Sequence, residues 1–201
     1  MIVADRGDDV KRNYEFLIGV TGHRDVSPEH IPLLEQAVYD LLREIIVDLP
    51  FEEITVLSSL AEGADQLCAR AALAAGLSLT VPLPMDACEY RKDFSEERAL
   101  EFDRLCGLAD NVFAVTPGEN IPAEPNRGFY YRQAGLYVAK RCHILLALWD
   151  GVKKETADGA GTYETIKLAL DISSIKEVWQ IVTPRENSMP DNVFSVVQLT
   201  E

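Results

Sequence analysis

The chain has 201 residues, 47% of them hydrophobic, and a formal net charge of −14. This length is enough to bury a substantial core and is short for two domains, so a single compact domain is expected. Acidic residues outnumber basic ones by 33 to 19, whereas a nucleic-acid surface needs a broad basic face, so the charge balance predicts no nucleic-acid partner. A local cationic pocket remains compatible with this charge.

The cysteines do not form a metal-binding or disulfide pattern. Cys68, Cys88, Cys106 and Cys142 are scattered, without a Cys-x-x-Cys pair or a histidine at ligand spacing, so neither a zinc site nor a disulfide framework is predicted. The sequence opens without a charged-then-apolar leader and contains no apolar run long enough for a bilayer. We therefore expect a cytoplasmic protein with free thiols, no metal, no cofactor and no membrane partner.

Apolar, β-branched runs alternate with amphipathic ones, which is typical of βαβ units on a parallel sheet. In chain order, the expected elements are a strand at 16–20, a helix at about 34–49, a strand at 54–60, a helix at 62–76, a strand at 77–83, a helix at 95–108, a strand at 111–116, a helix at 129–140, a strand at 143–149, a helix at 162–172, a strand at 178–183 and a weaker strand at 193–199.

The continuously apolar strands predict a sheet that is covered on both faces. The expected fold is therefore α/β: a three-layer αβα sandwich with a Rossmann-like, doubly wound, mainly parallel sheet of six to seven strands. Residues 1–15 are polar and are expected to form a flexible segment. A single domain is expected over residues 16–201.

Glycines and uncommitted polar residues gather where the predicted strands end. In a doubly wound sheet, ligands bind beyond the carboxyl ends of the strands. Glycine lets backbone amides approach a ligand, and a helix N-terminus presents N–H groups suited to phosphate. We therefore predict an anion-binding pocket at this edge. Its residues after the first, second and fifth strands are Gly22, His23, Arg24, Ser58, Gly63 and Asp150.

Some of these residues also have a structural interpretation. His23 and Arg24 are two potentially cationic neighbours, which is unfavourable unless an anion binds there, although Arg24 could instead pair with Asp25 or another carboxylate. Asp150 could accept a hydrogen bond from a ribose hydroxyl or open a turn with Gly151. The sequence leaves these alternatives open.

The segments GVTGHRD, EGADQL, YYRQAGLYVAKRCHILLALWDG and GAGTYETI follow one another along the chain. Their succession resembles the SLOG group of Rossmann-like nucleotide-binding domains, which includes the LOG phosphoribohydrolases and the DNA-processing protein A domain. The resemblance covers residues 16 to 183. In the LOG enzymes, PGG-x-GT-x-x-E holds a nucleotide phosphate, and the resemblance gives that role to Gly159, Gly161 and Thr162. The Thr162 hydroxyl at a helix start suits both capping and phosphate binding.

The resemblance also implies catalytic candidates. LOG enzymes cleave an N-glycosidic bond with the glutamate of this motif and an arginine on the preceding helix, and Arg132 lies near the position of that arginine. Glu164 is out of register, because Thr165 stands at the place of the glutamate and one helical step turns a side chain by about 100°. Glu62 is either a further catalytic carboxylate or the partner of Ser59 in a helix capping box.

Three functions are compatible with these features. The favoured one is a sensor or binding module that holds a nucleotide or nucleotide-derived ligand through its phosphate. The second is a nucleoside monophosphate phosphoribohydrolase, in which Glu164 or Glu62 acts at the sugar while Arg132 holds the phosphate. The third is an interaction domain with a vestigial pocket. Apolar helix faces are compatible with a homodimer but do not require one.

Overall fold

We analysed a computed structural model, which describes residues 15–47, 49, 53–118, 121–157, 159–172 and 177–200. Apart from Glu15, the segment expected to be flexible lies outside these residues. Seven strands form one sheet in the order β4-β3-β2-β1-β5-β6-β7. They are β1 (Glu15–Gly22), β2 (Glu53–Leu57), β3 (Ser78–Leu83), β4 (Asn111–Ala114), β5 (Ile144–Trp149), β6 (Glu177–Val182) and β7 (Val196–Leu199).

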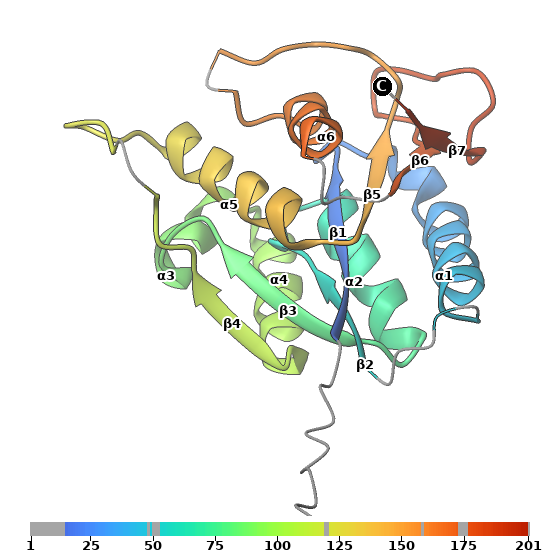
Figure 1. Ribbon diagram of the computed structural model, residues 1–201, viewed down its shortest axis with the longest axis horizontal. Coiled ribbons are helices and arrows are strands. Elements are labelled where there is room, and N and C mark those ends of the chain that lie inside the picture. Colours follow the sequence, from blue (N-terminus) through green and yellow to red (C-terminus); the bar gives the residue numbers. More distant parts are fainter. Residues whose placement is uncertain are drawn as a thin grey trace, which may run out of the picture.

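The helices follow the predicted alternation (Figure 1). They are α1 (Ile31–Val47), α2 (Ala64–Ala74), α3 (Ala87–Tyr90), α4 (Glu96–Leu108), α5 (Arg127–Arg141) and α6 (Thr162–Asp171), with 3-10 turns η1 (Pro28–His30) and η2 (Arg91–Asp93). The short α3 and η2 were not expected, because four residues are too few to give a helical period. Within the described residues, no helix is both long and apolar enough to cross a membrane.

The sheet is doubly wound. β1 pairs with β2 on one side and with β5 on the other, both in parallel. The strand order therefore reverses direction at β1, and only β7 runs antiparallel to its neighbour β6. The predicted α/β fold with a mainly parallel Rossmann-like sheet is confirmed. Its topological switch point lies between β1 and β5, where folds of this kind bind ligands.

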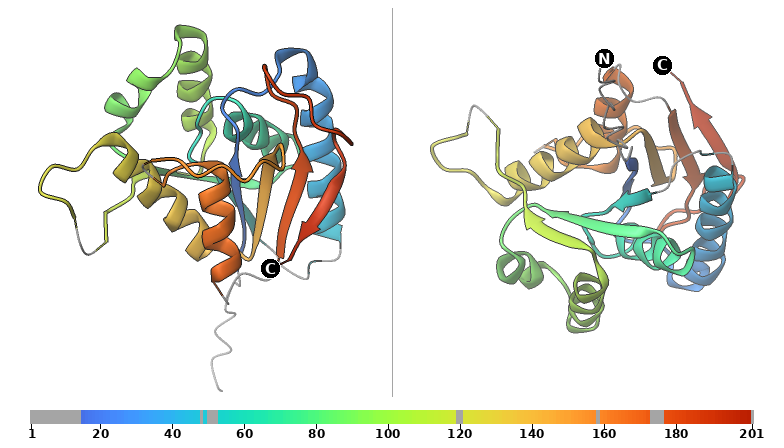
Figure 2. Two further views of the ribbon diagram at one scale, coloured as in Figure 1. Left: turned by 90° about the horizontal axis from the view of Figure 1, so that it is seen from above. Right: turned by 60° about the horizontal axis from the view of Figure 1, so that its bottom comes forward.

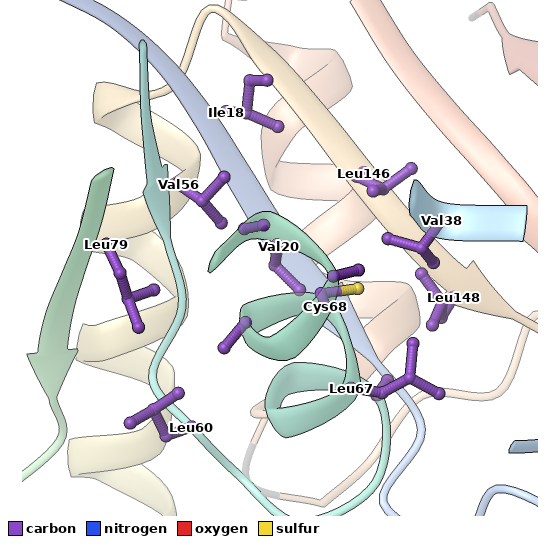
Figure 3. Close-up of a cluster of buried hydrophobic side chains, with 14 of the residues drawn as sticks. Ile18, Val20, Val38, Val56, Leu60, Leu67, Cys68, Leu79, Leu146 and Leu148 are labelled. Atoms are coloured by element: carbon purple, nitrogen blue, oxygen red, sulfur yellow. The ribbon is translucent and has the colours of Figure 1, made fainter. Parts of the chain in front are cut away.

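Helices cover both faces of the sheet, as the right-hand view of Figure 2 makes clear. On one face, α1 and α2 pack against Ile18, Val20 and Leu146, in the cluster drawn in Figure 3. On the other face, α5 and α6 cover a second buried cluster that includes Leu145 and Ala147. All six residues of β5 are buried, which explains the continuous apolar run seen in the sequence.

β2 ends three residues earlier than expected. It stops at Leu57 instead of residue 60, because the chain turns away from the sheet at Leu60, where φ is +56°. Few non-glycine residues adopt such a left-handed conformation. The turn directs Ala61 and the start of α2 toward the end of β1.

Candidate functional site

A cavity of about 390 Å³ lies at the carboxyl ends of β1 and β5. Its lining includes His23 and Arg24 from the turn after β1, and Gly161 and Thr162 at the start of α6. The segment between β5 and α6 arches over this end of the sheet, at the top of Figure 1. The two corners thus face one shared space at the switch point of the sheet.

The turn after β1 packs directly on the start of α2. Gly63 has a φ of +81°, and a Cβ atom there would lie 2.3 Å from the carbonyl oxygen of Arg24. The backbone N–H of Ala64 donates to the carbonyl of His23 at 3.0 Å. A Cβ atom on Gly22 would lie 2.4 Å from that of Ala64. Both glycines therefore serve close packing, and of the two only Gly22 lines the cavity.

An ionic network joins the ends of β1, β5 and β6. Arg185 donates to both carboxylate oxygens of Asp25, at 2.9 and 2.8 Å, and to Oδ2 of Asp150 at 3.2 Å. Oδ1 of Asp150 accepts from the backbone N–H of Val152 at 3.0 Å. Asp150 therefore opens the turn after β5. It is not among the residues that line the cavity.

His23 faces this network. Its Nε2 lies 3.0 Å from Oδ1 of Asp150 and 3.2 Å from the backbone nitrogen of the same residue. A neutral imidazole nitrogen can serve only one of these partners, as a donor or as an acceptor. Burial lowers the pKa of His23 and outweighs the opposing effect of Asp150. The ring is therefore neutral at pH 7 and is not a second cation beside Arg24.

The two acidic members of the network are ionised. Burial would raise the pKa of Asp25, but hydrogen bonds from Arg185 outweigh it and lower the pKa. Burial would also raise the pKa of Asp150, and the N–H of Val152, His23 and Arg185 together lower it. The carboxylates thus neutralise Arg185, although that side chain lines part of the cavity.

Arg24 is the more available cation. Its side chain is 42% exposed, lines the cavity and lies 3.6 Å from Glu62. Its guanidinium carbon also lies 5.8 Å from the centre of the Phe94 ring. The predicted alternative that Arg24 pairs with a carboxylate is realised with Glu62 rather than Asp25. Such a half-exposed pair is weak enough for an anion to replace.

The predicted capping box before α2 is wrong. The N-cap of α2 is Gly63, with no side-chain hydrogen bond. Ser59 instead donates to the carbonyl of Pro82 at 2.8 Å. Ser58 is fully buried and donates to the carbonyl of Asp65 at 3.1 Å. Neither Ser58 nor Glu62 is among the lining residues.

Asp65, in the first turn of α2, differs from the other acids of the site. It is 8% exposed and lines the cavity. Its Oδ2 accepts one long hydrogen bond, 3.4 Å, from the backbone N–H of Ala61. Burial raises the pKa of Asp65 to about 7, although Ala61 and Arg24 oppose the shift. This carboxyl is therefore partly protonated at neutral pH.

The start of α6 contains Glu164, a carboxylate whose pKa is lowered, in contrast to that of Asp65. Gly161 is the N-cap, so Thr162 is the first helical residue and not the cap that the sequence suggested. Glu164 accepts hydrogen bonds from both the backbone N–H and the hydroxyl of Thr156. Burial would raise the pKa of Glu164, but Thr156 lowers it. Its Oε2 would lie 2.4 Å from a Cβ atom on Gly161.

The catalytic candidates do not meet in the cavity. Glu164 is turned toward Thr156 and is not among the lining residues, nor is Arg132. Arg132 is exposed, and its Cδ would lie 3.6 Å from a Cβ atom on Gly159. Gly159 thus lies beside the expected arginine, outside the cavity lining.

Aromatic side chains form part of the cavity walls. Tyr90 is almost fully buried and lines the cavity together with Tyr131, whose hydroxyl donates to Asp93. Tyr163 also lines it and stacks on Trp149, with ring centres 5.9 Å apart. Flat walls of this kind suit a planar ligand.

The predicted site residues did not include several charged or polar lining residues, among them Asp65, Tyr90, Lys154 and Arg185. Each of these four follows the carboxyl end of a strand of the sheet. The same carboxyl-edge argument could therefore have included them. Among the described residues, no group of three histidine, cysteine or acidic side chains could hold a metal ion.

Fold and cavity define a Rossmann-like α/β protein whose pocket lies at the switch point. Structure comparison finds solved structures with a similar fold. DNA processing protein A from Streptococcus pneumoniae has a TM-score of 0.47 and 18% identity, over 78% of this chain and 47% of that one. DNA processing protein A from Helicobacter pylori has a TM-score of 0.46 and 12% identity, over 77% of this chain and 60% of that one. The structural-genomics target TM1055 has a TM-score of 0.43 and 13% identity, over 77% of this chain and 68% of that one.

These similarities concern the fold alone, and this chain spans about half the length of the S. pneumoniae protein. A scan against family models finds no match to the chain, and a search of curated proteins finds none either. The particular activity must therefore be argued from the cavity.

The prediction that excluded nucleic acid as a partner is wrong. DNA processing protein A from H. pylori, to which this chain is similar in fold, binds single-stranded DNA. The error lies in using total charge. Phosphate contacts are made by local groups, and Arg24 and Lys154 line the cavity of this acidic chain.

Proposed function

We propose that the protein binds a nucleotide or a nucleotide-derived ligand in the cavity at the carboxyl edge of the sheet. The observation that carries this proposal is the shared cavity of the two corners, His23–Arg24 and Gly161–Thr162. A volume of about 390 Å³ lies within the range of small-molecule sites.

The phosphate is assigned to the first turn of α6. The unpaired N–H groups of a helix N-terminus attract anions, and Gly161, Thr162 and Tyr163 all line the cavity. Arg24 and Lys154 supply positive charge within the same lining. The Glu164 carboxylate accepts from the Thr156 hydroxyl and also meets the backbone N–H groups of Gly161 and of Glu164 itself, so the phosphate is assigned to the N–H groups of Thr162 and Tyr163.

Binding without turnover is the favoured form of this function. The glycosidase alternative requires a glutamate that faces the ligand, and neither Glu164 nor Glu62 lines the cavity. No observation on the described residues favours the hydrolase over the binding module. Occupancy could be transmitted through the arching segment between β5 and α6, because that segment contributes Lys154 and Thr156 to the lining.

Thermal unfolding with the four ribonucleoside 5′-monophosphates tests the proposal. A ligand at 100 times its Kd stabilises the native state by about 2.7 kcal/mol, which corresponds to roughly 5–10 °C in Tm for a chain of this size. Chromatography should recover the nucleotide intact. Release of free base would support the hydrolase instead.

Two variants locate the binding. Arg24→Gln should weaken it about tenfold, because a charge-assisted contact is lost. Arg43→Gln is the matched control, since Arg43 is exposed on α1 and does not line the cavity; it should bind as the wild type does. Absence of a Tm shift with every mononucleotide would contradict the proposal, as would binding of a DNA oligonucleotide only.

A further inference from the structure

We propose that the carboxylate of Glu164 occupies the anion-binding start of α6 in the free protein, and that the phosphate of a bound nucleotide displaces it and so releases the arching segment between β5 and α6. Glu164 is then an internal competitor of the ligand and not a catalytic residue. This inference rests on the proposed function and goes further, because it states how occupancy of the cavity is transmitted to the surface of the molecule.

The Glu164 carboxylate takes up part of the first turn of α6. Glu164 is the third residue of this helix, and Gly161 is its N-cap. The carboxylate meets the backbone N–H groups of Gly161 and of Glu164 itself. The phosphate is assigned to the other two N–H groups of the turn, those of Thr162 and Tyr163, which line the cavity. Carboxylate and phosphate are attracted by the same helix N-terminus, and at this separation they repel each other.

Thr156, in the arching segment, holds the carboxylate in this position. Its backbone N–H and its hydroxyl both donate to Oε1 of Glu164. The same hydroxyl accepts the N–H of Ala160 at 3.1 Å, and the carbonyl of Thr156 accepts the N–H of Gly159, also at 3.1 Å. The conformation of the segment therefore depends on a threonine whose partner in α6 is Glu164.

The contact between Thr156 and Glu164 can be exchanged for a ligand. Oε2 of Glu164 is buried and makes no well-formed hydrogen bond within the described residues, so the carboxylate is only partly satisfied. Thr156 is exposed, and water can replace its contacts once they break. A phosphate monoester has a charge of about −1.5 to −2 at pH 7 and three acceptor oxygens. Arg24 and Lys154 in the lining favour it over a carboxylate.

This contact is also the main attachment of the arching segment to α6. Residues 151–157 are exposed. In the part of the chain that is described, two polar side-chain contacts join them to α6: Thr156 with Glu164, and Glu155 with Lys167 at 3.4 Å. The second pair is exposed at both ends and therefore weak. Displacement of Glu164 would free the segment that lies over this end of the sheet (Figure 1).

Calorimetric titration with adenosine, cytidine, guanosine and uridine 5′-monophosphates at pH 7.5 tests this inference. Glu164→Gln removes the competing charge, so the Kd of every nucleotide that binds should fall about tenfold below the wild-type value. The factor should be the same for each of them, because the phosphate is common to all four. Glu155→Gln is the matched control. It removes the same charge from the exposed pair with Lys167, outside the cavity lining, and should bind as the wild type does.

Thr156→Val tests the role of the threonine. The variant loses the hydroxyl that holds the carboxylate, so its Kd should fall about two- to threefold. If Thr156 acts only through Glu164, the double variant Glu164→Gln/Thr156→Val should bind as Glu164→Gln does. A hydroxyl that contacted the ligand directly would instead make the double variant weaker. Unfolding curves verify that each variant is folded.

Hydrogen exchange measures the release of the segment itself. The backbone N–H groups of Thr156 and Ala160 are both hydrogen-bonded while Glu164 is in place. Saturating nucleotide should raise their exchange rates about fivefold in the wild type. In Glu164→Gln these rates should be raised without nucleotide, because an amide oxygen is a weaker acceptor than a carboxylate.

Each possible result has a distinct meaning. Tighter binding by Glu164→Gln, together with faster exchange in the arching segment of the nucleotide-bound wild type, supports the inference. Equal or weaker binding by Glu164→Gln, slower exchange of the segment with nucleotide bound, or weaker binding by the double variant than by Glu164→Gln would each overturn it and leave the proposed function standing. Failure of all four nucleotides to bind to the wild type and to Glu164→Gln would overturn both.

Discussion

The first turns of α2 and α6 contain the same type of group in opposite states. Asp65 and Glu164 are both acids at the start of a helix that faces the switch point. Asp65 is buried with one long hydrogen bond, and its pKa is raised to about 7. Glu164 accepts two hydrogen bonds from Thr156, and its pKa is lowered. Favourable interaction with a helix N-terminus does not by itself decide whether a carboxyl is ionised.

The difference arises from what covers each helix start. Asp65 is 8% exposed, in a cavity wall that also contains Tyr90, so water solvates its charge poorly. Glu164 lies in the first turn of α6, just after the arching segment, where Thr156 provides donors that replace water. One carboxyl is therefore available to a ligand as a neutral hydrogen-bonding group, whereas the other organises the loop beside the proposed phosphate position.

The largest expected effect comes from Asp65→Asn. A pKa about three units above the ordinary aspartate value corresponds to about 4 kcal/mol. Between about pH 4 and pH 7 the folded state keeps a proton that the unfolded state has released, so the stability of the wild type falls across this window as pH rises. The free energy of unfolding of Asp65→Asn should therefore exceed the wild-type value at pH 8, by up to this amount.

Urea unfolding at pH 4, 6 and 8 measures this difference. The gain should be near zero at pH 4 and largest at pH 8. The prediction would fail if Asp65→Asn were less stable than the wild type at pH 8, or if its free energy of unfolding differed from the wild-type value by the same amount at all three pH values. Asp65 would then be ionised, as Glu164 is.

The next largest effect concerns the backbone around the two helix starts. Gly63→Ala should destabilise the fold by about 3 kcal/mol or more, because the new Cβ would meet backbone oxygens of the turn after β1 at 2.3 and 2.6 Å. Gly159→Ala is the matched control, with a φ of +64° and only the flexible Arg132 side chain at 3.6 Å. It should lose about 1–2 kcal/mol.

Chemical denaturation of both variants gives the comparison. Equal losses of stability in the two variants would mean that the Cβ contact at Gly63 adds nothing to the strain of a left-handed backbone. The start of α2 would then not pack against the end of β1 more tightly than α6 packs against its preceding loop. The difference of roughly 2 kcal/mol is the quantity of interest, since the left-handed backbone strain is common to both positions.

The smallest effect is expected for Glu164→Gln. Because the pKa of Glu164 is lowered in the folded state, its ionised form stabilises the fold at neutral pH, and this stabilisation disappears as pH falls through the glutamate range near 4. The variant should be about 1 kcal/mol less stable at pH 7, opposite in sign to Asp65→Asn. Glu155→Gln, which alters an exposed pair with Lys167, should leave stability unchanged.

Much of the fold could be predicted from sequence, because apolar periodicity and strand length are local properties. The six main strands, the weaker β7 and the five longer helices lie where the pattern indicated. The two corners were identifiable as well, since glycines and polar residues after strands mark the carboxyl edge. The end of β2 was not, because leucine rarely adopts the left-handed backbone conformation found at Leu60.

The chemistry of the candidate site was less predictable, because it depends on contacts between distant segments. Arg185 binds Asp25 across 160 residues of sequence. The protonation of Asp65 depends on its burial in the folded protein, which no local sequence pattern reveals. Total charge gave the wrong answer for nucleic acid, because an average over the surface contains no information about one cavity.

The central claim is that the cavity between the His23–Arg24 and Gly161–Thr162 corners binds the phosphate of a nucleotide. A crystal structure of the protein soaked with adenosine 5′-monophosphate tests it most directly. We expect the phosphate within hydrogen-bond distance of the backbone N–H groups at the start of α6, and the adenosine inside the same cavity. Phosphate density elsewhere on the molecule, or a cavity that stays without ligand at saturating nucleotide, would contradict the claim.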